Sequence, residues 1–132
     1  MIAAAPSTQR ILIAEDDDEM RRLLVRALSR DGYEVVAVAA GQPLLHALTS
    51  GAGPSQYALV ISDLRMPGMS GLEVVRELRA RGSRLPVLLM TAFGGEDTLI
   101  QARKLEVTAV FAKPFDVDDL RTAVLHFLRS DN

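Results

Sequence analysis

The chain has 132 residues, of which 48% are hydrophobic and 24% are charged, and its formal net charge is −2. These values are typical of one globular domain, and the small net charge gives no general reason to bind nucleic acid or an anionic membrane. The absence of cysteine excludes disulfides and thiolate metal sites. No apolar stretch approaches a membrane span, and Met1 to Pro6 does not resemble a signal peptide. We therefore expect a cytoplasmic protein in which residues 1–9 form a flexible tail and residues 10–130 form one domain.

Short apolar runs typical of buried strands recur along the chain, at residues 11–14, 33–39, 57–62, 86–90 and 109–112. Apolar residues at helical spacing follow each run and predict helices from Met20 to Leu28, around residues 43–49, from Leu72 to Leu78, near residues 96–105 and from Val117 to Leu128. Ser70 with Glu73 forms a capping-box pattern before the third helix, and Asp116 is expected to cap the last one.

Alternating strands and helices predict an α/β fold of the type (βα)₅. Continuous apolar strands indicate that helices cover both faces of a parallel sheet. Right-handed crossovers favour a doubly wound, flavodoxin-like sheet with strand order 2-1-3-4-5. In that order the chain reverses direction between the first and third strands, where Asp16 and Asp63 lie.

Reactive side chains stand at the ends of four of these strands. An acidic stretch that includes Glu15 and Asp16 follows the first strand, Asp63 ends the third, Thr91 ends the fourth, and Lys113 follows the fifth. Because ligands bind at the carboxyl ends of strands in open parallel sheets, we expect these groups to form one site.

The chemistry of this set favours a divalent cation and a phosphoryl group. Three crowded carboxylates (Glu15, Asp16 and Asp63) repel each other unless a cation intervenes, and hard oxygen ligands without His or Cys suit Mg²⁺ or Mn²⁺. Asp63 is a carboxylate nucleophile that can form an acyl phosphate. The ammonium of Lys113 and the hydroxyl of Thr91 are suited to hold phosphoryl oxygens.

From Arg10 to Arg129 the chain resembles the receiver domain of two-component response regulators. Four matching segments carry the resemblance, in order and each at a strand end: Ile11-Leu12-Ile13-Ala14-Glu15-Asp16-Asp17, Ile61-Ser62-Asp63 through Gly71, Met90-Thr91-Ala92 and Lys113-Pro114-Phe115. The resemblance implies that Asp63 accepts phosphate from a sensor histidine kinase or a histidine phosphotransfer protein and returns it slowly to water.

The resemblance also implies roles for the neighbouring residues. Asp16 would bind Mg²⁺ directly, Glu15 through water, and Arg65 through its backbone carbonyl. On the phosphoryl side, Lys113 and Thr91 would contact the oxygens, supported by the amide of Ala92 and by a cis bond between Lys113 and Pro114.

The resemblance implies that output passes through protein contact. Movement of Thr91 would remodel the surface formed by the fourth helix, fifth strand and fifth helix. An unknown downstream protein would bind this surface, and a homodimer could form through it. The loop Gly94-Gly95 would allow that movement. We expect no direct nucleic-acid or membrane partner, and we leave open whether the chain is a stand-alone regulator or part of a longer protein.

Two positions near the site lead to separate expectations. Family members often carry an aromatic residue three positions before the lysine, where this chain has Val110. Phe111 points to the opposite face of its strand, so we expect it in the core and not as a substitute. Phe93 and Arg65 flank the expected phosphoryl site, and we hypothesise that they set the lifetime of the acyl phosphate.

Other readings differ in what they require of the sequence. A pseudo-receiver that acts only as an interaction module would not need the complete acid, threonine and lysine set. A dehalogenase-type phosphatase needs an aspartate two residues after the nucleophile, where Arg65 stands. A nucleotide or flavin binder would need a Gly-rich loop after the first strand.

The remaining charged residues have simpler readings. Asp18 and Glu19 suit a helix N-terminus, and His46 and His126 are expected at the surface or in packing. Arginines 21, 22, 76, 79 and 81 are expected on solvated helix faces, with Arg21 or Arg22 an option for docking a kinase.

Overall fold

The computed structural model describes residues 8–92 and 95–129. These residues form five strands, five α-helices and one short 3-10 helix. In chain order they are β1 (Arg10–Ala14), α1 (Asp18–Arg30), β2 (Glu34–Val38), α2 (Gly41–Thr49), η1 (Gly53–Gln56), β3 (Leu59–Asp63), α3 (Gly71–Ala80), β4 (Val87–Thr91), α4 (Glu96–Lys104), β5 (Ala109–Ala112) and α5 (Val117–Leu128).

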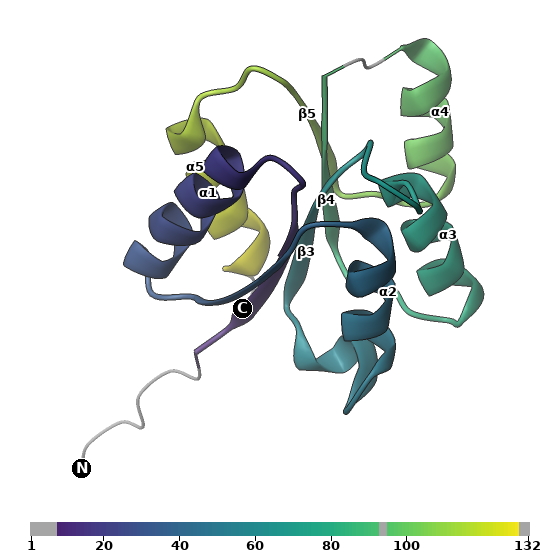
Figure 1. Ribbon diagram of the computed structural model, residues 1–132, viewed down its shortest axis with the longest axis horizontal. Coiled ribbons are helices and arrows are strands. Elements are labelled where there is room, and N and C mark those ends of the chain that lie inside the picture. The colour runs from purple at the N-terminus through teal and green to yellow at the C-terminus, as the bar shows by residue number, and fades with distance from the viewer. Residues whose placement is uncertain (1–7, 93–94, 130–132) are drawn as a thin grey trace.

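All strand pairs are parallel, and the sheet has the order β2-β1-β3-β4-β5. Helices α1 and α5 cover one face, and α2, α3 and α4 cover the other (Figure 1). The predicted doubly wound (βα)₅ fold is therefore confirmed. In this topology every strand ends at the same edge of the sheet, which collects the residues that follow β1, β3, β4 and β5.

The core lies in two layers, one on each face of the sheet. Alternate residues of one strand point into different layers: Leu12 and Ala14 of β1 join the layer beneath α2, α3 and α4, and Ile11 and Ile13 join the layer beneath α1 and α5. Each of these β1 side chains is fully buried. This burial on both faces explains why the strands read as continuous apolar runs.

Helix starts follow the capping residues that the sequence indicates. Ser70 accepts a hydrogen bond from the Glu73 amide, and Glu73 accepts one from the Ser70 amide, so the capping box is formed. Asp116 caps α5, and Asp17 caps α1, with Asp18 and Glu19 in its first turn. These acids stabilise helix N-termini, as predicted.

Helix α2 begins two residues earlier than the sequence predicts. Its first residue is Gly41, and Pro43 lies inside the first turn. Proline is tolerated there because the first N–H groups of a helix need no carbonyl of the preceding turn. A β-carbon on Gly41 would meet the Met69 carbonyl oxygen at 2.0 Å, so the helix start depends on a close approach of two distant segments.

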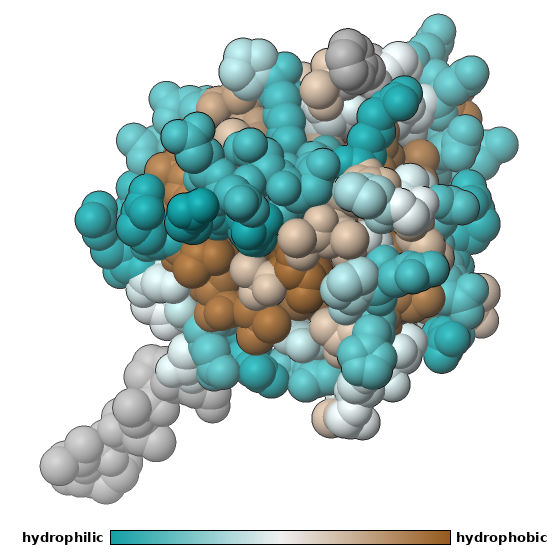
Figure 2. All heavy atoms as spheres, viewed as in Figure 1, coloured by the Kyte–Doolittle hydropathy of each residue, from teal (hydrophilic) through white to brown (hydrophobic). Residues whose placement is uncertain are grey.

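Strand β2 is an edge strand and leaves hydrophobic side chains at the surface between α1 and α2 (Figure 2). Val35, Val36 and Val38 are partly buried there. Within residues 8–92 and 95–129, none of the helices combines the length and the apolar character needed to cross a membrane.

Candidate functional site

The carboxyl edge of the sheet gathers buried polar side chains at the strand ends. The exposed fractions are 1% for Glu15, 7% for Asp63 and 2% for Thr91, whereas Asp16 is exposed. Buried polar groups are costly unless they are paired. Their concentration at one edge of an otherwise apolar sheet marks it as the functional end of the molecule.

Lys113 joins two of these acids. Its Nζ lies 2.6 Å from Glu15 Oε1 and 3.0 Å from Asp63 Oδ2, so the end of β1, the end of β3 and the segment after β5 meet at one ammonium group. The Lys113 amide also donates to the Thr91 carbonyl at 2.7 Å, which fixes the segment after β5 to the end of β4. The structure thus brings together the strand-end residues that the sequence singled out.

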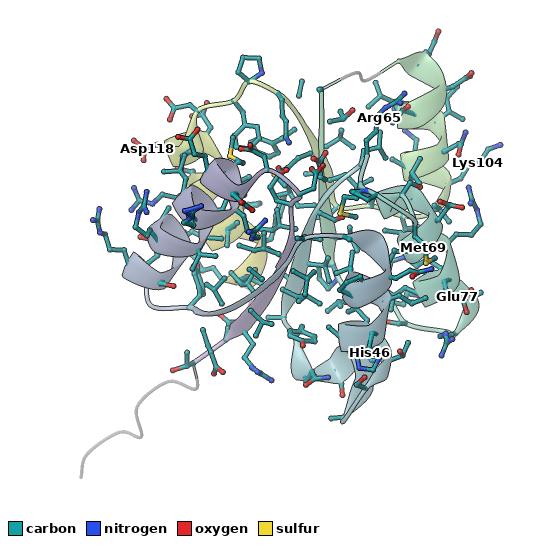
Figure 3. All side chains as sticks on the ribbon, in the orientation of Figure 1. His46, Arg65, Met69, Glu77, Lys104 and Asp118 are labelled. Atoms are coloured by element: carbon teal, nitrogen blue, oxygen red, sulfur yellow. The ribbon has the colours of Figure 1, made fainter. Side chains whose placement is uncertain are left out.

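The acids form a cluster with the donor set of a hard cation. One carboxylate oxygen from each of Glu15, Asp16 and Asp63 lies within 4.8 Å of the others. A set made only of carboxylates suits Mg²⁺ or Mn²⁺, with water filling the remaining positions. Arg65 is exposed at the same end of the sheet, two residues after Asp63 (Figure 3).

Burial and neighbouring charges shift the pKa values of Glu15 and Lys113. Burial raises the pKa of the Glu15 carboxyl and the charge of Asp63 adds to it, against hydrogen bonds from Lys113 and the Asp17 amide. Burial alone lowers the pKa of Lys113, but its hydrogen bonds to Glu15 and Asp63 and their charges outweigh it, so the pKa is raised. One charged ammonium therefore contacts two of the three clustered acids, so the cluster holds more acids than cations.

The loop between β3 and α3 fixes the position of Asp63. The Leu64 amide donates to the Met90 carbonyl at 2.7 Å, and the Gly71 amide donates to the Leu64 carbonyl at 2.8 Å. A β-carbon on Gly71 would lie 2.5 Å from the Asp63 carbonyl oxygen, so glycine is what allows α3 to start against the end of β3. Ser62 Oγ donates to the same carbonyl at 2.9 Å.

The end of β4 and the segment after β5 lie side by side. Thr91 is buried beside Lys113, Ala92 is exposed next to it, and the peptide bond between Lys113 and Pro114 is cis. Phe93, which the sequence suggested as a lifetime modulator, lies outside the described residues, as does the Gly94 part of the expected flexible loop.

Val110 and Phe111 occupy opposite faces of β5. Val110 packs on the layer beneath α2, α3 and α4, whereas Phe111 packs on the layer beneath α1 and α5. Phe111 also contacts Phe115 edge to face, with ring centroids 5.8 Å apart. Phe111 is therefore partly buried and packs against the core, on the face that the sequence predicted.

Two arginines differ from their sequence-based reading as solvated residues. Arg21 donates to the Glu15 carbonyl at 2.9 Å, directly behind the acid cluster. Arg79 donates to the carbonyls of four residues: Ser83, Leu85, Leu105 and Glu106. Helical spacing places an arginine on a face but does not reveal which carbonyls lie within its reach. His46 and His126 are exposed as predicted, and Figure 3 shows His46 on α2, away from the acid cluster.

The sequence profile of the response regulator receiver domain matches residues 11–125. Sporulation initiation phosphotransferase F of Bacillus subtilis is 32% identical over 120 residues, covering 91% of this chain and 94% of that protein. Transcriptional regulatory protein TctD of Salmonella typhimurium is 38% identical over 120 residues, covering 91% of this chain and 52% of that protein. The chain thus spans about half the length of TctD and nearly all of the Bacillus protein.

A solved structure gives the same fold. The non-phosphorylated HemR receiver domain from Leptospira biflexa has a TM-score of 0.85 at 23% identity, covering 95% of this chain and 98% of that one. The fold, the strand-end residues and the profile match over most of the chain agree. The chain belongs to the response regulator receiver domains, the family that signals through phosphorylation in two-component systems.

Proposed function

We propose that Asp63 accepts a phosphoryl group from a phosphohistidine of a sensor histidine kinase or a histidine phosphotransfer protein. The observation that carries this proposal is the placement of Asp63, at the end of β3, 3.0 Å from the ammonium of Lys113. A carboxylate oxygen attacks phosphorus, an O–P bond forms, the P–N bond breaks, and the donor imidazole leaves with the electron pair. The name of the Bacillus relative, a phosphotransferase, is in keeping with this chemistry.

Three groups around Asp63 are placed to hold the transferred phosphoryl oxygens. Lys113 supplies an ammonium that already contacts Asp63, Thr91 supplies a hydroxyl at the neighbouring strand end, and the amide of Ala92 follows it. Phosphoryl transfer depends mainly on positioning and charge neutralisation, so fixed donors of this kind are what the reaction requires.

We assign the acid cluster to Mg²⁺, with Mn²⁺ as a substitute. Glu15, Asp16 and Asp63 would hold the ion, together with the backbone carbonyl of Arg65. The fit rests on the all-carboxylate donor set and on the presence of one ammonium among three acids. When bound, the ion supplies a positive charge that neutralises a phosphoryl oxygen.

Return of phosphate to water ends the signal, and we propose that Arg65 and Phe93 set its rate by screening the acyl phosphate. Arg65 is exposed two residues after Asp63, close enough in sequence to cover it. Dephosphorylation rates of Arg65→Ala and Phe93→Ala, followed after removal of the phosphate donor, test this role. Rates equal to that of the wild type would remove it.

Output is proposed to leave through α4, β5 and α5, which bind a downstream protein or a second copy of the chain. Leu99 and Ile100 of α4 are exposed hydrophobic residues with exposed fractions of 44% and 41%. Val110 stands where family members often carry an aromatic residue, and it packs on one core layer. Movement of Thr91 would therefore act on α4 without an aromatic side chain at this position. The alternative function is a pseudo-receiver that presents the same surface without being phosphorylated.

The intact mass of the protein after incubation with acetyl phosphate and Mg²⁺ tests the proposal. We expect one added phosphoryl group, absent in Asp63→Asn and absent when EDTA removes the metal. Acetyl phosphate lacks the docking surface of a kinase, so the second arm uses a phosphorylated histidine phosphotransfer protein as donor. No added mass in either arm would favour the pseudo-receiver.

A further inference from the structure

We propose that Arg21 is a positioning residue for the metal-binding loop: its guanidinium holds the peptide unit that precedes Asp16 and thereby presents the Asp16 carboxylate to the cation. This inference rests on the proposed function, because it assigns Arg21 a part in binding Mg²⁺. Arg21 lies in α1, close to its N-terminus, and its side chain reaches back to the β1–α1 loop.

The backbone on both sides of Asp16 is fixed by side chains. Arg21 Nη1 donates to the Glu15 carbonyl oxygen at 2.9 Å, which fixes the peptide plane leading into Asp16. Glu15 Oε2 accepts from the Asp17 amide at 3.0 Å, which fixes the peptide plane leading out. Asp16 itself is exposed, so its direction depends on these two planes and not on packing of its own side chain.

Arg21 completes a full set of partners around Glu15. The Glu15 amide donates to the Val38 carbonyl at 3.1 Å, and Glu15 Oε1 accepts from Lys113 Nζ at 2.6 Å. With the Asp17 amide on Oε2 and Arg21 on the carbonyl, each polar atom of Glu15 has a partner. Four hydrogen bonds thus hold Glu15 in place, and Arg21 supplies the bond from α1 to the Glu15 carbonyl.

Geometry distinguishes Arg21 from its neighbour Arg22. The Arg21 side chain is 22% exposed, and its second terminal nitrogen pairs with Asp18 Oδ1 at 2.5 Å, so the guanidinium is held between Asp18 and the loop. Arg22 carries the same charge one residue later but is exposed. The planar fork of arginine suits two simultaneous contacts, whereas lysine offers a single point of charge. Arg22 is thus a matched control for charge, and lysine at position 21 is a matched control for geometry.

Isothermal titration calorimetry with Mg²⁺ or Mn²⁺ alone measures metal affinity without the need for phosphorylation. We expect Arg21→Gln to lower the affinity for the metal by about tenfold. This is the lower end of the loss seen when a residue that supports a metal ligand is removed. Arg21→Lys should recover part of that loss. Arg22→Gln should bind as the wild type does.

Kinetics separate positioning from a general loss of structure. In Arg21→Gln the Mg²⁺ concentration for half-maximal phosphorylation by acetyl phosphate should rise about tenfold, while the rate at saturating Mg²⁺ stays near that of the wild type. Without metal, the Asp17 amide should exchange with solvent faster in this variant, because the loop that holds it is looser. Each result supports a role that acts through Asp16.

Two outcomes would overturn the inference while leaving the proposed function intact. One is wild-type metal affinity in Arg21→Gln, and the other is an equal loss in Arg22→Gln, which would assign the effect to net charge. If the wild type binds neither metal, the proposed function fails and the role of Arg21 fails with it. Thermal unfolding of each variant without metal shows whether the fold is preserved.

Discussion

Lys113 lies closer to Glu15 than to Asp63: its Nζ is 2.6 Å from Glu15 Oε1 and 3.0 Å from Asp63 Oδ2. One ammonium therefore neutralises an acid of the cation cluster as well as the proposed phosphoacceptor. A cation that binds Glu15 competes with Lys113 for the same carboxylate. We therefore expect the lysine to oppose metal binding and to favour phosphoryl binding at the proposed site.

Replacement of Lys113 by Gln should affect the two steps in opposite directions. Removal of one positive charge from contact with the acids should tighten Mg²⁺ binding roughly tenfold, because charges at this separation interact by about 1 to 4 kcal/mol in partly screened sites. Phosphorylation by acetyl phosphate at saturating Mg²⁺ should become slower, since a phosphoryl oxygen loses its ammonium partner. Calorimetry measures the first effect and intact mass against time the second. Lys104→Gln, at the only other lysine of the chain, controls for net charge.

A weaker affinity for Mg²⁺ in Lys113→Gln would contradict this competition. It would indicate that the ammonium organises the acids for the metal and does not oppose it. Slower phosphorylation alone would fit either role of the lysine. The Mg²⁺ affinity and the phosphorylation rate of Lys113→Gln are therefore both needed.

Glu15→Gln should stabilise the protein in the absence of metal. Burial raises the pKa of the Glu15 carboxyl in the folded state, with a contribution from the Asp63 charge. A raised folded pKa contributes stability below the unfolded value and loses it as pH rises through the folded value, so ionised Glu15 costs stability at neutral pH. We expect the variant to gain about 1 kcal/mol in the free energy of unfolding, as is common when an active-site group is neutralised.

Urea unfolding at several pH values tests the role of Glu15. The gain should be present at pH 7 and fade below about pH 4, where glutamate becomes protonated in the unfolded chain as well. Saturating Mg²⁺ should reverse the order, because the wild type binds the metal better. Glu19→Gln, at an exposed acid of the first turn of α1, should change little. A loss of stability in Glu15→Gln without metal would contradict the argument from burial.

The fold and the acid cluster were predictable because both follow from local patterns. Five apolar runs separated by helical spacing lead to one strand order, and that order brings the residues after β1, β3, β4 and β5 to one edge. That topology was enough to expect Lys113 near the acids, although the distances themselves come from the structure. The capping box at Ser70 was equally local, since its two partners are three residues apart.

The features that sequence could not supply depend on contacts between distant segments. Arg21 and Arg79 stand at positions typical of solvated helix faces, yet each bonds to backbone carbonyls that the tertiary fold brings within reach. The start of α2 at Gly41 lies against the Met69 backbone, a contact between segments far apart in the sequence. A pattern of residue types records neither carbonyl directions nor the spacing of two loops.

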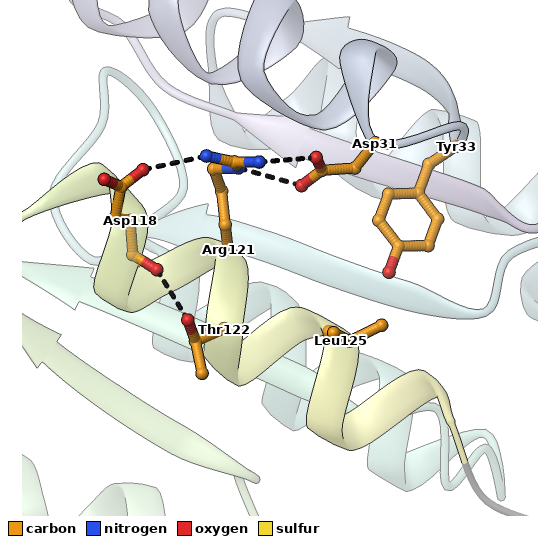
Figure 4. A pocket seen from close by; sticks show the side chains of 6 residues that line it. All are labelled: Asp31, Tyr33, Asp118, Arg121, Thr122 and Leu125. Carbon is orange, nitrogen blue, oxygen red and sulfur yellow. Dashed lines mark hydrogen bonds and ion pairs between the residues drawn. The ribbon is translucent and has the colours of Figure 1, made fainter.

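A charge network between α1 and α5 should make stability depend on pH in the acidic range. Arg121 holds Asp31, the C-cap residue after α1, through two contacts of 2.7 and 2.9 Å, and holds Asp118 through a third (Figure 4). The hydrogen bond from Arg121 lowers the pKa of Asp31. A lowered folded pKa contributes stability above the unfolded value and loses it as pH falls through the folded value.

Asp31→Asn should therefore lower the Tm at pH 6, and the Tm difference should shrink as pH falls and the wild-type carboxylate becomes protonated as well. These residues border a surface pocket of about 410 Å³, so solvent screens the pair and the effect should be small. Differential scanning calorimetry of both proteins across this range measures it, with added salt expected to reduce the difference. A Tm difference that does not change with pH would rule out the ion pair as its cause.

Arg79→Ala should destabilise the protein by about 2 kcal/mol, because it leaves partly buried carbonyls without a donor. Arg79 joins the end of α3 to the segment after α4, with contacts of 2.8 Å to the Leu105 carbonyl and 2.9 Å to the Leu85 carbonyl. Arg76→Ala removes an exposed arginine that contacts Gln101, and it should cost much less. Urea unfolding measures both, and faster amide exchange in α4 of Arg79→Ala would locate the effect. Equal losses in the two variants would assign the effect to charge or helix propensity.

Gly71→Ala should both destabilise the fold and slow phosphorylation of Asp63. The added β-carbon would lie 2.5 Å from the Asp63 carbonyl oxygen and 3.1 Å from Ser62 Oγ, so the start of α3 must move away from the end of β3. Overpacking of this kind costs about 1 to 3 kcal/mol. The shift acts on the backbone of Asp63, the proposed phosphoacceptor, and should move its carboxylate relative to Lys113.

Gly95→Ala is the matched control, because no atom lies within 4 Å of a β-carbon at that position before α4. Its cost should stay below about 1 kcal/mol, the difference between glycine and alanine at a helix N-cap. Urea unfolding and the rate of acetyl phosphate labelling at saturating Mg²⁺ compare the two variants. If Gly71→Ala loses stability but labels at the wild-type rate, the close approach serves the fold alone. If it loses both while Gly95→Ala keeps both, the contact between α3 and Asp63 sets the position of the phosphoacceptor.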